Sequence, residues 1–100
     1  MKPIVVTLCG STKFKREFMQ ANASETMAGK IVLSVGGFDH VEGVTLTDSQ
    51  REMLGKLHMH KIDMADEILV LNVGGYIGES TRSEIEYAQQ CGKHVRFLEV

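Results

Sequence analysis

Four short apolar runs, separated by stretches with helical patterns, constrain the fold of this chain more than any other feature of its sequence. The runs are residues 4–9, 31–35, 67–73 and 94–100, and Ile, Val and Leu dominate them. They alternate little between apolar and polar residues, which is typical of strands that are buried on both faces of a parallel sheet. The sequence therefore predicts an α/β fold with a four-stranded parallel sheet.

Three helices are expected between these strands, over residues 12–29, 48–64 and 81–91. The first carries an apolar stripe of Phe14, Phe18 and Ala21, and the second an apolar face of Met53, Leu54 and Leu57. Two overlapping capping boxes precede the second helix, Thr47 with Gln50 and Ser49 with Glu52. Right-handed crossovers would place helices on both faces of the sheet, giving one small Rossmann-like or flavodoxin-like three-layer domain over residues 1–100.

Charge and composition narrow the class of partner. The formal net charge is -2 and no basic run is present, so we expect no binding to nucleic acid or to a membrane surface. No apolar run is long enough to span a membrane, and we expect a cytoplasmic protein. The two cysteines, Cys9 and Cys91, are expected to be buried free thiols. The alternative is a reactive Cys9, because it precedes a predicted helix start.

Glycine-rich segments follow the first three predicted strands, at residues 9–13, 34–40 and 72–81. The carboxyl ends of parallel strands meet at one edge of a sheet, where α/β proteins bind ligands. In the first segment, Gly10 allows a tight turn, Ser11 adds a hydroxyl and Lys13 a positive charge. These groups suit a phosphate at a helix start, although a simple helix cap has the same residues.

The third glycine-rich segment leads to a carboxylate that has two interpretations. Three glycines precede Ser80 and Thr81, and Glu84 follows three residues after Thr81. Thr81 and Glu84 could form a capping box with no further function. Alternatively, the helix dipole holds Glu84 ionised in the first helical turn, where it faces the cleft and serves as a nucleophile.

Histidine spacing gives no metal site. His58 and His60 are two residues apart on a predicted helix and therefore face different ways. No other His, Cys or acidic residue has metal-ligand spacing, so the sequence predicts neither a metal nor a cofactor. His40 lies in the loop after the second strand, where it is either a solvated residue or part of a lid.

Three segments resemble the nucleoside 2-deoxyribosyltransferase family, including its deoxynucleoside 5′-monophosphate N-glycosidase branch. Residues 6–13 resemble that branch's opening strand and phosphate loop, and residues 62–66 resemble the segment before the third strand. Residues 80–88 with 92–95 resemble the catalytic helix, on which Glu84 matches the nucleophilic glutamate. Thr7 and His58 stand where the family has Tyr and Asp, and Glu86 replaces a glycine.

The resemblance implies an enzyme that cleaves the N-glycosidic bond of a nucleoside or nucleoside 5′-monophosphate, by hydrolysis or by transfer, without cofactor or metal. It implies a covalent glycosyl intermediate on Glu84, with His58 or His40 handling the leaving base. The phosphate would be held by five residues: Gly10, Ser11, Lys13, Gly78 and Ser80. It also implies a homodimer or a higher homo-oligomer, in which a neighbouring chain completes the site.

Two alternatives remain at this point. Gly74 and Gly75, with Ser80, Thr81 and Glu84, loosely resemble the motif of the cytokinin-activating phosphoribohydrolases, a family often described as lysine decarboxylase-like. The other alternative is a catalytically silent module that binds or senses nucleotides on the same fold, because function depends on the site and not on the fold.

Overall fold

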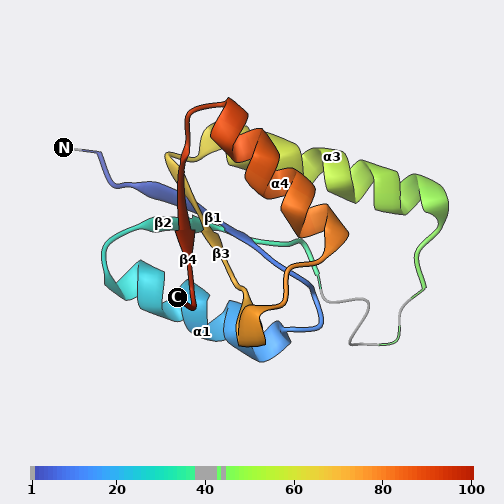
Figure 1. Ribbon diagram of the computed structural model, residues 1–100, viewed down its shortest axis with the longest axis horizontal. Coiled ribbons are helices and arrows are strands. Elements are labelled where there is room, and N and C mark those ends of the chain that lie inside the picture. The colour runs from blue at the N-terminus through green and yellow to red at the C-terminus, as the bar shows by residue number, and fades with distance from the viewer. Residues whose placement is uncertain (1, 38–42, 44) are drawn as a thin grey trace.

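Four parallel strands form the centre of the molecule, as the sequence predicts. The computed structural model describes residues 2–37, 43 and 45–100, and Figure 1 shows their arrangement. The strands are β1 (Val5–Cys9), β2 (Ile31–Leu33), β3 (Glu67–Val70) and β4 (His94–Phe97). Their order in the sheet is β2-β1-β3-β4. The chain thus continues to one side of β1 and later returns to the other, which creates a topological switch point between β1 and β3.

Helices cover both faces of the sheet and complete the three-layer Rossmann-like domain. Helix α1 (Lys15–Met27) lies on one side, and α3 (Asp48–Met64) and α4 (Glu79–Gln90) lie on the other (Figure 1). The core divides accordingly. Val6 and Leu8 of β1 pack with Phe18 of α1, whereas Cys9 packs with Ile62 of α3 and with Ala88 of α4.

β1 ends at Cys9 as expected, but β2, β3 and β4 end earlier than the sequence pattern indicates. We expected β3 to reach Val73, but it ends at Val70 and leads into the short 3-10 turn η1 (Val73–Gly75). Gly74 and Gly75 adopt positive φ angles of 63° and 82°, a conformation that a strand does not contain. The last strand ends at Phe97, and the following backbone at Glu99 exchanges two hydrogen bonds with the Asn72 side chain instead.

The second predicted helix is confirmed, but its apolar face is exposed and does not pack into the core. α3 spans residues 48–64, and Thr47 and Gln50 form its capping box, so Ser49 and Glu52 lie inside the helix. Met53, Leu54 and Leu57 are 51%, 36% and 48% exposed, while the helix buries His58 and Ile62. The first half of α3 therefore presents its apolar side chains to solvent.

The cysteines differ from each other, although both were expected to be buried. Cys9 is fully buried at the end of β1, and Cys91 is exposed after the end of α4. Both are free thiols. The expectation failed for Cys91 because this residue follows the last turn of the helix, where the chain bends toward β4.

Candidate functional site

A pocket of about 450 Å³ opens at the carboxyl edge of the sheet, beside the switch point. Segments that follow β1, β2 and β3 line it, together with side chains of α3 and α4. Six of the predicted site residues line this pocket: Gly10, Ser11, His58, Gly78, Ser80 and Glu84. The volume lies within the range of small-molecule sites.

The first wall of the pocket is the turn after β1. A Cβ atom at Gly10 would lie 3.2 Å from both Cβ and the backbone O of Leu71, which follows β3, so glycine allows a close approach of the two segments here. Ser11 and Thr12 follow and also line the pocket. We expected the helix to begin near Thr12, but a turn precedes it and α1 begins at Lys15. The groups that face the pocket here thus belong to a loop and not to the helix start.

The second wall is the beginning of α4, and here both predicted interpretations of Glu84 need correction. The helix begins at Glu79, after Gly78, and no side chain caps it. Thr81 is therefore a buried residue of the first turn, and the predicted capping box of Thr81 and Glu84 does not form. Glu84 lies in the second turn, beyond the reach of most of the dipole effect. Instead of remaining ionised, it has a pKa that burial raises to about 7.

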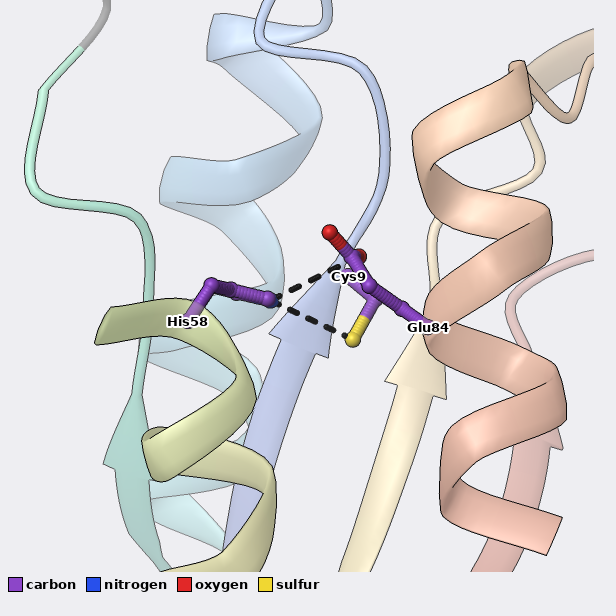
Figure 2. Close-up of side chains that lie close together, drawn as sticks. All are labelled: Cys9, His58 and Glu84. Atoms are coloured by element: carbon purple, nitrogen blue, oxygen red, sulfur yellow. Dashed lines mark hydrogen bonds and ion pairs between the residues drawn. The ribbon is translucent and has the colours of Figure 1, made fainter. Parts of the chain in front are cut away.

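Glu84 lies close to two other ionisable side chains, His58 in the pocket lining and the buried Cys9. Nε2 of His58 lies 3.6 Å from Oε1 of Glu84 and 3.4 Å from Sγ of Cys9. Figure 2 shows that the three side chains come from α4, α3 and the end of β1 and point toward one another. We call these residues, Cys9, His58 and Glu84, the triad.

The pKa of each member of the triad is shifted in the direction that favours the neutral form of its side chain. Burial lowers the pKa of His58 to about 4, and the positive charge of Lys61 adds to this effect. Burial raises the pKa of the Cys9 thiol well above its usual value, and the nearby Glu84 carboxylate raises it further. A thiol with a raised pKa does not attack as a thiolate, so the predicted alternative of a reactive Cys9 is not supported by this environment.

Three residues near the pocket were missed by the sequence analysis. Lys61 lines the pocket one helical turn after His58, and its Nζ donates a hydrogen bond to the carbonyl of Ser34 at 2.6 Å. Tyr76 also lines the pocket. Cys9 was considered only for its own reactivity and not as a partner of Glu84. The periodicity of α3 is the signal that could have found Lys61, because residues three apart share a helix face.

Two predicted residues are not placed in the pocket lining. The Lys13 ammonium lies 3.6 Å from the centre of the Tyr76 ring, a cation–π contact at the side of the site. Its role as a phosphate ligand stays a prediction. His40 lies outside the described residues.

The triad also combines three donor types that bind metals. One ligand atom from each residue lies within 4.8 Å of the other two. The sequence could not indicate this set, because its members are far apart along the chain and no two share a recognisable spacing. As a group, they offer either a positioned carboxylate or a set of thiolate, imidazole and carboxylate ligands.

Comparison with known proteins assigns no family to this chain. In the described part of the chain, no helix has the length and apolar character that crossing a membrane requires. No protein-family model matches the chain, and a search of curated proteins finds no match either.

Proposed function

We propose that this chain is an enzyme of N-glycosidic bonds that acts on a nucleoside or a nucleoside 5′-monophosphate through Glu84. One observation carries the proposal. Glu84 and the turn of Gly10 and Ser11 line the same pocket, although Ser11 and Glu84 are 73 positions apart in the sequence. A nucleophile and a phosphate-binding turn are the two parts that the sequence resemblance requires.

The two walls of the pocket suit the two ends of such a substrate. Backbone N–H groups at the start of α4 have no side-chain cap, and Gly78 and Ser80 there line the same pocket as Ser11. Free N–H groups at a helix start attract anions, so a 5′-phosphate fits between the two segments. Lys61 adds a positive charge to the same pocket. The sugar would then lie over Glu84 and the base toward the outer end of the pocket.

The reaction proceeds through a covalent intermediate. An ionised Glu84 oxygen attacks the anomeric carbon, the C–N bond breaks, and its electron pair leaves with the base. Water, or a second base, then attacks the same carbon and releases Glu84. Because the pKa of Glu84 is about 7, about half of the free protein would hold the nucleophile ionised at neutral pH.

His58 suits a positioning role better than proton donation. Its pKa of about 4 means that the imidazole is neutral at pH 7 and cannot act as an imidazolium acid. Its Nε2 faces Glu84 and Cys9, which favours orientation of the carboxylate. His40 therefore remains the candidate for handling the leaving base.

A homodimer or higher homo-oligomer is part of this proposal. Met53, Leu54 and Leu57 are exposed on the first half of α3, and Leu54 and Leu57 also line the pocket. Contact with a second copy on this face would cover apolar surface and close the pocket at the same time. Light scattering at micromolar concentration tests this, and a monomer would contradict it.

The test of the function is a panel of ribo- and deoxyribonucleosides and their 5′-monophosphates, with release of free base followed by chromatography. We expect release from at least one class, and a loss of about 10³-fold or more in Glu84→Gln. Glu86→Gln is the matched control, because Glu86 is exposed on the same helix. A parent protein that binds nucleotides but releases no base would favour the silent binding module instead.

A further inference from the structure

Two of the three ligand separations in the triad match those of a tetrahedral metal site. Around a zinc ion with bonds of about 2.3 Å to sulfur and about 2.0–2.1 Å to nitrogen or oxygen, neighbouring ligand atoms lie about 3.3–3.6 Å apart. The separations here are 3.4 Å from Cys9 Sγ to His58 Nε2 and 3.6 Å from that nitrogen to Glu84 Oε1. The remaining pair, Cys9 Sγ and a Glu84 oxygen, lies within 4.8 Å, so these two atoms would move toward each other when all three bind one ion.

The burial of the triad also favours an ion. Cys9 is fully buried, His58 is 7% exposed, and the Glu84 side chain is 15% exposed. Buried groups of this kind are retained in proteins when they are paired or when they bind a metal. A divalent cation would balance one thiolate and one carboxylate, and a neutral imidazole would complete the set without adding charge.

We propose that Cys9, His58 and Glu84 bind Zn²⁺, with the fourth coordination position open to the pocket. His58 and Glu84 line the pocket, so solvent reaches the place where the fourth ligand would lie. Three protein ligands with one open position is the arrangement of accessible zinc sites, in contrast to closed structural sites with four. The mixed set, which includes a thiolate, favours zinc over magnesium or calcium.

Binding is a ligand exchange without any redox step. The Cys9 thiol loses its proton to solvent and its sulfur forms the bond to zinc. His58 binds through the lone pair of Nε2, and Glu84 binds through a carboxylate oxygen after losing any proton that it carries. Zinc loses water molecules in return. Uptake of zinc should therefore release protons, as expected for thiolate sites.

Zinc would also regulate the proposed reaction, and this corollary alone rests on the proposed function. The carboxylate that attacks the sugar is the same group that would bind the ion. A loaded site therefore has no free nucleophile. We expect Zn²⁺ to inhibit base release and a chelator to restore it.

The deciding experiment uses a protein with one thiol. The chain has two cysteines, so Cys91→Ser leaves only Cys9. We expect this variant, with a reducing agent, to bind one Co²⁺ and to develop the intense near-ultraviolet absorption of a thiolate–cobalt bond. Added Zn²⁺ should remove the absorption by displacing cobalt. Absence of the band would overturn the proposal without requiring any change in the triad.

Matched substitutions identify the other ligands in the same background. Competition with a chromophoric chelator measures zinc affinity, which should fall about 100-fold or more in His58→Gln and in Glu84→Gln, since even partners outside the ligand set contribute 10–100-fold, roughly. His60→Gln and Glu86→Gln are the controls, because both residues are exposed on the same two helices. Equal losses in the controls, or no loss in the triad variants, would overturn the assignment. Circular dichroism verifies that each variant is folded.

The binding measurements do not depend on enzymatic activity. A protein that binds zinc through the triad but releases no base after a chelator has removed the metal supports the metal site and contradicts the proposed function. A protein that releases base but shows no cobalt absorption contradicts the metal site and leaves the proposed function supported.

Discussion

The two ends of the sheet hold two clusters of ionisable side chains that differ in how their charges are balanced. At the amino end, Arg96 contacts carboxylate oxygens of Glu25 and Glu67 at 2.7 Å each, and Lys30 contacts Glu67 at 2.8 Å. At the carboxyl end, the triad places a thiol, an imidazole and a carboxylate together. The first cluster joins opposite charges, while the second is neutral or singly charged.

The pKa shifts show what this difference means. A hydrogen bond from Arg96 lowers the pKa of Glu25. Burial alone would raise the pKa of Glu67, but hydrogen bonds from Lys30 and Arg96 lower it overall. In the triad, burial dominates and displaces every pKa toward the neutral form. A strongly perturbed pKa in a pocket marks a candidate functional site, whereas the paired charges at the amino end are typical of a structural ion-pair network.

The largest expected effect is on the amino-end cluster. Arg96→Met leaves Glu25 and Glu67 with Lys30 as their shared cation, so two carboxylates retain one partner. We expect the free energy of unfolding to fall by about 3 kcal/mol, the low end for breaking a buried ion pair, because the Arg96 side chain is 30% exposed. Urea unfolding measures this. A loss below about 1 kcal/mol would mean that the cluster behaves like surface ion pairs.

In the triad, removing a charge is expected to raise the free energy of unfolding, which is the opposite of the effect expected for Arg96→Met. Because the folded-state pKa of Glu84 is about 7 and its usual value is 4.5, its favourable contribution is complete below pH 4.5 and is lost as pH rises through 7. Glu84→Gln removes the buried charge and should stabilise the chain by about 2 kcal/mol at about pH 8.5, with little gain at about pH 4.5. The nearby ionisable groups are Cys9 of β1 and His58 and Lys61 of α3.

Urea unfolding at both pH values, with a chelator present, tests this prediction. Glu86→Gln is the control on the exposed side of α4 and should change stability little at either pH. A destabilised Glu84→Gln protein at high pH would show that the carboxylate has a stabilising partner, which would remove the contrast between the two ends of the sheet.

The smallest expected effect distinguishes the two causes of the low pKa of His58, which are burial and the charge of Lys61. Lys61→Met removes the cation whose charge contributes to the low pKa of His58. The pKa of His58 should rise by a few tenths of a unit and stay well below 6.5, because burial is the larger cause. An NMR titration of the imidazole protons measures it. A return to 6.5 would show that charge, and not burial, controls this site.

Much of the fold could be predicted because its signals are local. The apolar strand runs and the capping box of Thr47 and Gln50 depend on neighbours in the sequence, and both are confirmed. The exposed face of α3 could not be predicted in the same way. Met53, Leu54 and Leu57 form an apolar face, but whether a helix face is covered depends on where the helix lies relative to the sheet.

The candidate site was predicted in part for the same reason. Gly10, Ser11, Gly78 and Glu84 line one pocket because parallel strands bring their carboxyl ends together, a consequence of fold class that the sequence supplies. The contact of Cys9 with His58 joins residues 49 positions apart. No sequence periodicity indicates such a contact. The burial that determines the three pKa values of the triad likewise cannot be inferred from a local sequence pattern.

Alternate side chains of β1 face opposite sides of the sheet, and this determines which mutations of the strand are tolerated. Val6 and Leu8 face α1, while Thr7 and Cys9 face α3 and α4. One strand thus contributes two sets of residues to two different layers of the molecule. The layer beneath α1 still meets the pocket at Val35, which packs against that core cluster and also lines the pocket. A single-residue insertion within β1 would exchange the two sets, so this strand tolerates replacement far better than any change in its length.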